Sequence, residues 1–554
     1  MPKRVPRWLL LSLATLLLLT AGCGRPGDDP TLTVPTTVQV GGATGQELAA
    51  AQILRKGNGA EPESLDPHRA EGVPSADILR DLFEGLITEA PDGALIPGAA
   101  ETWTISPDGR IYTLRLRANG RWSNGDPVTA EDFAFSLRRS ADPATLSEYG
   151  ANLYPIENAE AVVNGKLPPD RLGVRAVDAR TLEIRLHSPT PYFLGLLTHA
   201  TTYPVHRPSL LKFGDRFTRP GNLVSNGAYR LNAWVVQSHL QLTRNPYYWE
   251  NDKTIINEVW YYPIENADSE LNRYRANEFD LTFTLPNRSI PWLRKNLPQE
   301  LHLSTYLGSY VYGFNTSQPP FKDNIPLRKA MAMALDRDIL VNKITGAGEV
   351  ASYGWVPPVT GYKNQQPVWA SWTQAQRNDE ARRLYRAAGY SPEKPLRVEL
   401  LYNTEINHRR LAVAMAAMWR DVLGVETELM NEEWPVFLQT RRTRIDTQVF
   451  RYGWIGDYND PHTFASILES RHGLNDMAYS NPRYDALLLK ASQEADPAAR
   501  MAMLEEAERI MLDDMPILPI YMYVTKRLVK PWVAGYVDNI MDYHHSRHYR
   551  ILKH

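Results

Sequence analysis

The chain has 554 residues, which is more than one hydrophobic core normally serves, so its length alone predicts two or three domains. With 43% hydrophobic and 22% charged residues, the composition is that of an ordinary globular protein, and most of the chain should fold. The formal net charge of −2 gives no reason to expect nucleic acid as a partner.

The first residues have the features of an export signal. Lys3, Arg4 and Arg7 form a basic segment, and Leu9–Leu19 is a mostly apolar run that is too short to span a bilayer comfortably. Small residues follow, as they do before a cleavage site. We therefore interpret residues 1–23 as an export signal with a lipobox-like end, and not as a membrane helix.

The only cysteine, Cys23, stands at the end of this segment, so an intrachain disulfide, a thiolate zinc site and a CxxC redox pair are all excluded. Its position resembles a bacterial lipobox, in which the cysteine is lipidated and becomes the mature amino terminus, although Thr20 stands where that pattern usually has Leu. A lipidated Cys23 would hold the protein at a membrane. Residues 24–50 would then form a flexible tether. Ordinary signal-peptidase cleavage beside an unmodified Cys23 is the alternative.

The first half of the chain shows signals for both strands and helices. Ile53–His68 reads as a short strand and a Pro-containing loop, and Ser75 is expected to cap a helix that ends near Gly85. Thr129 opens the sequence Thr-Ala-Glu-Asp, which is close to a capping box and predicts a second helix. Strands are also expected at Ile111–Arg117, Asp178–Leu186, Leu240–Arg244 and Val259–Ile264, and a helix at Leu271–Ala276.

A composition shift near residues 308–326 leads into a second half with clear helical signals. Apolar residues at four-residue spacing predict one continuous helix over Pro326–Lys343. The other expected elements are a helix along the apolar stripe 411–422 that ends at Gly424, a strand at Val425–Leu429, and a long helix from Asp496-Pro497 to about Asp513. Helices followed by strands favour α/β packing in this half.

The stretch Arg451–Pro461, RYGWIGDYNDP, is the strongest binding candidate. It places one carboxylate, Asp457, between a Tyr-Gly-Trp segment and a Tyr-Asn-Asp-Pro turn. Trp434, Arg441, Arg442 and Arg444 precede this stretch, and Arg451 is its first residue. An anion and cations lined with aromatic residues suit a ligand that has a positive and a negative end, such as a zwitterionic peptide. The alternative is that Asp457 caps a turn and the arginines form a solvated face.

Common catalytic and metal-binding motifs are absent from the sequence. There is no GxxxxGK[ST] phosphate loop, GxSxG elbow, HExxH helix or spaced Cys/His zinc pattern. A Ser-His-Asp triad assembled from distant positions would leave no such pattern, and nothing supports one. His544, His545 and His548 cluster near the carboxyl terminus, where a solvated surface is expected rather than a metal site. We therefore expect no cofactor, no metal and no enzymatic activity.

Six segments in order resemble one known family. They are LDPHRAEGVPSADILRDLFEGL at 65–86, RWSNGDPVTAEDF at 121–133, NGAYRLNAWVV at 226–236, ALDRDILVNK at 334–343, GWIGDYNDP at 453–461 and RLVKPWVAGY at 527–536. Each segment alone is weak, but six in the right order are highly specific. From about Ser64 to its end, the chain resembles the periplasmic oligopeptide-binding proteins, the substrate-binding components of peptide ABC importers (extracellular solute-binding family 5).

The resemblance implies an α/β fold: the two-lobed periplasmic-binding-protein fold, class II type, with an additional inserted domain. By that pattern lobe I takes residues 51–83, 208–307 and 525–554, the extra domain takes 84–207, and lobe II takes 308–524. The composition shift near residues 308–326 agrees with one of these crossing points.

The resemblance also implies roles for single residues. Asp457 matches the carboxylate that pairs with the α-ammonium of the ligand, which needs an opposite charge once it leaves water. Arg451 and one of Arg441 or Arg442 match positions that supply positive charge, and one extra residue before Val449 leaves open which of the two aligns. His408 matches a histidine that meets the carboxylate of some peptides. The other matching cleft positions are Glu71, Val73, Trp434, Trp454, Tyr149, Tyr521 and Tyr523.

Some of these positions have a structural alternative. Trp454 could belong to the core, and Tyr521 and Tyr523 could belong to a buried strand. A well-known member of the family carries a disulfide in its second lobe, whereas the equivalent positions here hold Gly308 and Ile455. Rigidity around Asp457 would then depend on packing.

These features predict a protein that binds short peptides in a closing cleft and delivers them to an ABC permease in the inner membrane. We expect a periplasmic monomer that contacts a membrane through a lipid anchor at Cys23. The same fold with another solute is the main alternative: a murein tripeptide, a dipeptide, a metal chelate or a sugar. A periplasmic hydrolase or a peptide-dependent chaperone is the alternative from another class.

Overall fold

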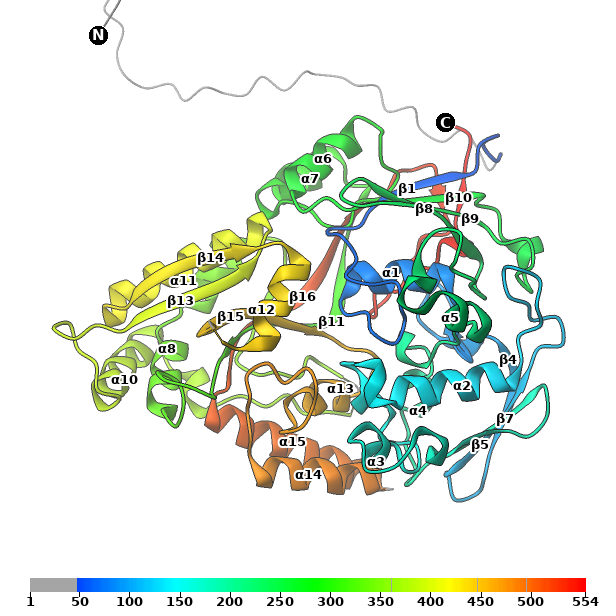
Figure 1. The fold of residues 1–554 in the computed structure, drawn as a ribbon. Helices are drawn as coiled ribbons and strands as arrows, with labels where there is room; N and C mark the ends of the chain where they lie inside the picture. The colour runs from blue at the N-terminus through cyan, green and yellow to red at the C-terminus, as the bar shows by residue number, and fades with distance from the viewer. Residues whose placement is uncertain (1–46, 360, 446, 495) are drawn as a thin grey trace, which may run out of the picture. The chain divides into compact units, whose positions relative to one another are not determined.

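The computed structural model of the protein describes residues 47–359, 361–445, 447–494 and 496–554. The predicted export signal, Cys23 and most of the predicted tether lie outside these residues. Within them the strands form three main sheets with helices packed against them (Figure 1). None of the described helices combines the length and the apolar character that crossing a membrane requires.

The first sheet joins strands from the predicted lobe I. Its spatial order is β1 (Ile53–Gly57), β10 (Glu258–Tyr262), β9 (His239–Arg244) and β8 (Tyr229–Val235). β1 runs parallel to β10, and the other pairs are antiparallel. The helices of this region are α1 (Val73–Leu82), α5 (Arg207–Phe213), α6 (Ala267–Arg275) and α7 (Ile290–Asn296).

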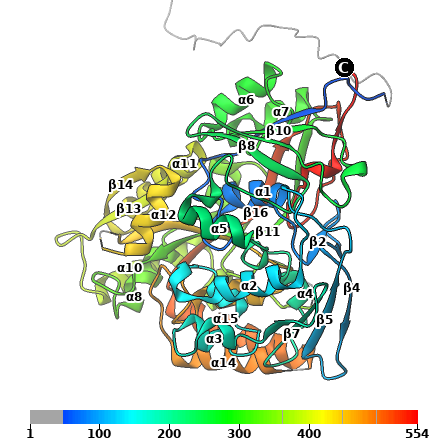
Figure 2. The ribbon, with the colours of Figure 1, turned by 45° about the vertical axis from the view of Figure 1, so that its right-hand side comes forward.

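The second sheet lies in the predicted extra domain. It is antiparallel, in the order β4 (Ala100–Ile105), β5 (Ile111–Leu116), β7 (Thr181–Arg185) and β6 (Val174–Ala176). α2 (Ala130–Ala141) packs against β6 and β7, and α3 (Ala159–Val163) and α4 (Phe193–Leu196) lie in the same region (Figure 2). The predicted capping box is confirmed, because the side chains of Thr129 and Asp132 each accept the other's backbone N–H. One apolar core runs from Tyr112 in this sheet to Tyr261 in the first.

The third sheet has six strands. Their order is β12 (Val350–Ala351), β16 (Ile517–Leu528), β11 (Leu301–Phe314), β15 (Val449–Ile455), β13 (Arg397–Asn403) and β14 (Glu426–Glu432). Tyr310 and Tyr312 of β11 join one core and Val311 joins another, so helices cover both faces. The helices of this half are α8 (Ile325–Met333), α9 (Arg337–Ile339), α10 (Gln374–Ala387), α11 (Ile406–Leu423), α12 (Trp434–Thr443), α13 (His462–Ala465), α14 (Pro482–Gln493) and α15 (Pro497–Asp514).

β11 and β16 form a long antiparallel pair that extends from the predicted lobe I into the predicted lobe II (Figure 1). Their register shifts between Thr305 and Ser309, next to the predicted crossings at 307/308 and 524/525. A local irregularity at the point where two strands pass between lobes is a suitable place for hinge bending. The boundaries of the lobes themselves stay a prediction.

Most predicted elements are present to within a few residues, but the single helix over Pro326–Lys343 is wrong. α8 ends at Met333, and Asp336 begins a new turn by accepting the N–H of Ile339 at 3.0 Å. The buried guanidinium of Arg337 donates to the carbonyl of Ala332 at 3.0 Å, which a continuous helix would have bonded to residue 336. Local capping and this buried arginine outweigh the apolar spacing.

The histidine cluster near the carboxyl terminus is also not solvated as expected. His545 is 4% exposed and its Nε2 lies 3.2 Å from Glu89, while His544 Nε2 lies 2.7 Å from Asp542. Among the described residues, no group of side chains has the arrangement of a metal site.

Four short strands lie outside the three main sheets. They are β2 (Ile87–Glu89), β3 (Leu95–Pro97), β17 (Val533–Ala534) and β18 (Arg550–Ile551).

Candidate ligand-binding site

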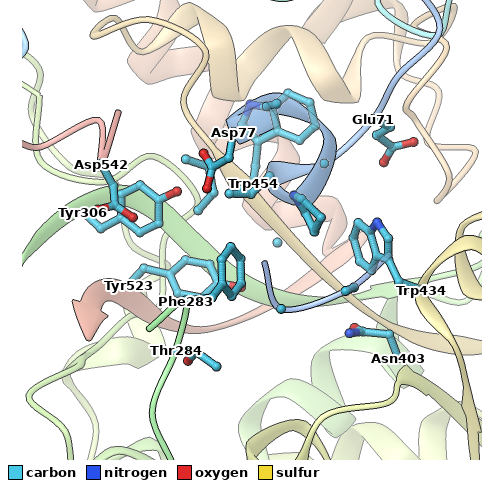
Figure 3. A pocket seen from close by; sticks show the side chains of 18 of the residues that line it. Glu71, Asp77, Phe283, Thr284, Tyr306, Asn403, Trp434, Trp454, Tyr523 and Asp542 are labelled. Carbon is cyan, nitrogen blue, oxygen red and sulfur yellow. The ribbon is translucent and has the colours of Figure 1, made fainter. Parts of the chain in front are cut away.

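A cavity of ≈ 310 Å³ brings together residues that are far apart in the sequence. Its wall comes from the segment around α1, from β15 and β16, from the first turn of α11, from both ends of α12, and from the predicted extra domain. In Figure 3, Glu71 and Trp434 face the cavity from one side and Tyr306 and Asp542 from the other. The volume is near the lower end of the range, about 300–1,000 Å³, of small-molecule sites.

The structure brings the predicted ligand-binding residues to this cavity, with the exception of Arg442. Those on its wall are Glu71, Val73, Tyr149, His408, Trp434, Arg441, Arg451, Trp454, Asp457, Tyr521 and Tyr523. Trp454 and Tyr521 are also largely buried, at 6% and 4% exposed, and both tyrosines do lie on a strand, β16. Trp454 can therefore be largely buried, and both tyrosines can lie on a strand, while all three still line the cavity. Cys23 lies outside the described residues.

Asp457 follows β15 and is 7% exposed. Its carboxylate accepts hydrogen bonds from Asn152 Nδ2 at 3.4 Å and from the Thr463 hydroxyl at 3.3 Å, and His199 Nε2 lies 3.4 Å away. Burial raises the pKa of Asp457 to about 7, because these donors offset only part of the cost of leaving water. Burial also lowers the pKa of His199 to about 3, so the imidazole is neutral. Among the described residues, no Lys or Arg forms an ion pair with Asp457.

Arg451, on β15, is the cavity cation that forms no ion pair with a carboxylate of the described chain. Its Nη2 donates to the Tyr523 hydroxyl at 2.6 Å, and its guanidinium lies 5.1 Å from the centre of the Tyr310 ring. Its buried Nε has no hydrogen-bond partner among the described residues. Burial and the positive charge of Arg451 hold the pKa of His408 well below its usual value, so His408 is neutral.

Arg441 and Arg442 are committed to carboxylates of the protein itself. Arg441 Nη2 lies 2.8 Å from Glu71, and its Nε bonds Asp476. Arg442 Nη1 lies 2.8 Å from Glu63, and its Nη2 bonds Glu71. Of the two arginines, Arg441 reaches the cavity wall and Arg442 does not. Their ion pairs join the segment between β1 and α1 to α12.

Several wall residues were not among the predicted ones. His199 comes from the predicted extra domain, and Asp77 and Asp542 come from the first and last parts of the chain. Asn152, also of the predicted extra domain, bonds Asp457 without lining the cavity. Asp77 pairs with Arg80, and Asp542 pairs with Arg527 at 2.5 Å. No local sequence pattern marks these residues, because each reaches the cavity only through tertiary contacts.

Comparison with known proteins identifies the family of this chain. The family model described as bacterial extracellular solute-binding proteins, family 5 Middle, matches residues 94–475. The chain belongs to this family. The chain is 43% identical over 515 residues to the periplasmic oligopeptide-binding protein OppA of Escherichia coli. This alignment covers 92% of this chain and 94% of that protein. The α/β, two-lobed fold expected from the sequence is confirmed.

Solved structures of family 5 relatives differ in how well they match this structure. Haemophilus influenzae OppA in complex with the peptide RPPGFSPFR is 38% identical and matches with a TM-score of 0.89, covering 92% of this chain and 100% of that one. The E. coli murein tripeptide-binding protein MppA, 40% identical, also gives 0.89, with the same coverage. The unliganded open form of MppA gives only 0.64, at 40% identity and with 92% and 99% of the two chains covered. The structure therefore matches the peptide complex of OppA more closely than the unliganded open form of MppA.

Proposed function

We propose that the protein binds short peptides in this cavity, in the periplasm, and delivers them to an ABC importer. One observation carries the proposal. Asp457 and Arg451 are opposite charges on one cavity wall, and neither has an oppositely charged partner among the described residues. A zwitterionic peptide supplies an ammonium and a carboxylate to meet them. The similarity to OppA proteins supports this choice of ligand.

The peptide would lie extended and add main-chain hydrogen bonds to the protein, which do not depend on the identity of its side chains. The aromatic wall residues would line roomy pockets in which bridging water replaces direct contacts. They are Tyr149, Trp434, Trp454, Tyr521 and Tyr523, with Glu71, Val73 and His408 beside them. Arg441 would act from the wall while it stays paired with Glu71. The lobes would close around the peptide by hinge motion.

Calorimetry with three forms of one tripeptide tests the proposal. N-acetylation removes the ammonium, and C-amidation removes the carboxylate. Each change should weaken binding by about 10- to 100-fold, as expected for losing a charged hydrogen-bonded contact. Asp457→Asn should remove the effect of acetylation, and Arg451→Met the effect of amidation. Equal affinity of the unmodified protein for the free and the acetylated peptide would end the ammonium-site role of Asp457.

A murein tripeptide is the second candidate ligand, because the similarity to MppA is nearly as high as that to OppA. Mass spectrometry of ligands that co-purify with the protein distinguishes the two. Family 5 proteins are binding proteins, and we infer that this chain is no enzyme. Recovery of an intact peptide after incubation with the purified protein tests that inference against the hydrolase alternative.

We also infer that the protein acts as a monomer and is tethered to a membrane by a lipid at Cys23. The lipobox-like placement of the cysteine supports the anchor. The mass of the mature amino-terminal peptide tests it, since diacylation adds a mass that Cys23→Ser would remove.

A further inference from the structure

The carboxylate of Asp457 is held by side chains from a distant part of the chain. Asn152 Nδ2 lies 3.4 Å from Oδ2, and His199 Nε2 lies 3.4 Å from Oδ1. Both residues belong to the predicted extra domain, whereas Asp457 and its third donor, Thr463, belong to the predicted lobe II. The environment of this carboxylate is therefore assembled from two regions that are far apart in sequence.

The neighbours of His199 determine which ring nitrogen carries the proton. The backbone N–H of Thr201 lies 3.3 Å from Nδ1, so Nδ1 must accept. The hydroxyl of Thr201 lies 2.8 Å from the same nitrogen. A neutral ring that accepts at Nδ1 carries its proton on Nε2. The protonated Nε2 of His199 therefore lies 3.4 Å from Oδ1 of Asp457.

Further contacts fix the two donors against the region that carries Asp457. Tyr192 stacks on Tyr458, with ring centroids 4.7 Å apart and planes 4° apart. The hydroxyl of Ser188 donates to the carbonyl of Ser492 at 2.5 Å. The ring centroid of Tyr149 lies 4.6 Å from that of His199 and 5.9 Å from that of Trp454, which precedes Asp457. The predicted extra domain thus packs directly on the residue that follows Asp457.

We propose that His199 and Asn152 are positioning residues of the ammonium site, which makes the predicted extra domain a working part of ligand recognition. This inference rests on the proposed function. The donors are neutral, so they orient the carboxylate and favour its ionised form without cancelling its charge. A Lys or Arg in the same place would compete with the ammonium of the ligand.

The other titratable groups around Asp457 leave its charge available. The positive charge of Arg80, on α1, lowers the pKa of Asp457. Arg80 itself pairs with Asp77 at 3.0 Å, and its guanidinium lies 3.5 Å from the centre of the Tyr543 ring. Burial raises the pKa of each surrounding phenol, so all stay protonated. These are Tyr149, Tyr452, Tyr458 and Tyr543.

Removal of the His199 donor has a defined effect on pH dependence. Burial raises the pKa of Asp457 to about 7. An N–H beside a carboxylate favours its ionised form, so we expect the loss of His199 to raise this pKa further. Only the ionised carboxylate pairs with an ammonium, so the affinity for a free peptide falls more near pH 6.5 than near pH 8. The peptide's own α-amine, which has a pKa of about 8, limits binding at higher pH.

The test measures dissociation constants of an N-acetylated and a free tripeptide between pH 5.5 and 8.5. Their ratio reports recognition of the ammonium alone. His199→Ala and Asn152→Ala should each lower the ratio by about 10-fold near pH 6.5, and by less near pH 8. His199→Gln places an amide donor near the Nε2 position and should recover most of the ratio. His199→Asn places it near Nδ1 and should not.

His206→Ala is a matched control. His206 Nδ1 also accepts a backbone N–H, that of Ser209 at 3.3 Å, and its Nε2 lies 3.2 Å from Asp126, but this pair is not on the cavity wall. The ratio and its pH profile should be unchanged in this variant. Thermal unfolding of every variant separates loss of folding from loss of recognition.

The possible failures are distinguishable. An unchanged ratio in folded His199→Ala and Asn152→Ala, or no difference between the Gln and Asn variants, would overturn the positioning role and leave the proposed function standing. If the unmodified protein itself does not discriminate between the two peptides, the proposed function fails first.

Discussion

At Asp457 a carboxylate charge has no counter-ion within the described protein. Water is largely excluded from it, its side-chain donors are Asn152 and Thr463, and the neutral ring of His199 lies 3.4 Å away. Ionising a carboxylate in such surroundings costs free energy until a cation arrives. The features that prepare this residue for an ammonium therefore lower the stability of the empty protein.

Asp457→Asn should reveal this cost as a pH-dependent gain in the stability of the empty protein. In the folded state the pKa of Asp457 is raised from 3.8 to about 7, so its stabilising contribution is complete below about pH 4 and is lost as pH rises through 7. Asn does not titrate. The free energy of unfolding of the variant, minus that of the unmodified protein, should grow from pH 4 to pH 8 by at most about 4 kcal/mol. Urea unfolding at several pH values measures this difference.

Asp460→Asn is the comparison for this prediction. Asp460 lies three residues away, but it forms two bonds to Arg500, at 2.9 and 2.8 Å. Its replacement should destabilise the protein, because Arg500 would lose its charged partner. A difference for Asp457→Asn that stays flat between pH 4 and pH 8 would contradict the raised pKa.

Among the secondary-structure elements, β11 and β15 come close at the two positions where the family resemblance places a disulfide in a relative. Gly308 lies directly opposite Ile455. Because the N–H of Gly456 donates to the carbonyl of Leu307 at 2.8 Å, the 308/455 pair is of the non-hydrogen-bonded type. The Cα atoms of such pairs lie about 4.5 Å apart, a spacing that permits a disulfide.

Gly308→Cys combined with Ile455→Cys should therefore form a disulfide on oxidation. The experiment uses a Cys23→Ser background, so that the two new thiols are the only ones. The bond should raise the free energy of unfolding by about 2–4 kcal/mol, because it closes a long loop in the unfolded chain. Thiol titration, and thermal unfolding with and without reductant, measure the outcome.

Gly308→Cys alone is the control for this pair. A Cβ at position 308 would lie 2.5 Å from Ile455 Cδ1, so the single variant should be less stable than the unmodified protein. Ile455→Cys removes that atom, and the contacts left are 3.0 Å to Tyr523 Cδ2 and 3.1 Å to the Trp454 carbonyl oxygen. Two thiols that stay free under oxidising conditions would show that the strands are not paired in this register.

Elements with a local signature could be predicted, whereas the strands that build the cavity could not. The capping box at Thr129 and the left-handed stop at Gly424 depend on a few neighbouring residues. β11 and β16 are covered by helices on both faces and so lack the alternation that marks a half-buried strand. His199 and Asn152 meet Asp457 only after folding. The predicted cavity residues came from the family resemblance, which already carries tertiary information.

At the scale of the whole folded region, ion pairs join segments that are far apart in sequence, in an arrangement that resembles a peptide complex of a relative. The segment between β1 and α1 carries Glu63 and Glu71, and α12 carries Arg441 and Arg442. Both partners of each pair belong to the protein itself. They should therefore bias the lobes toward closure whichever peptide is bound.

Arg442→Met tests whether these ion pairs favour closure, because Arg442 forms two of them but is not on the cavity wall. The empty variant should have a larger radius of gyration in X-ray scattering, and saturating peptide should reverse the change. Free, acetylated and amidated peptides should all lose affinity by one factor, about 10-fold, since a shift in the closing equilibrium affects every ligand alike. Arg382→Met, whose pair with Asp379 stays within α10, should change neither quantity. Unequal losses would mean that Arg442 contacts the ligand itself, and unchanged affinities would mean that closure does not depend on these pairs.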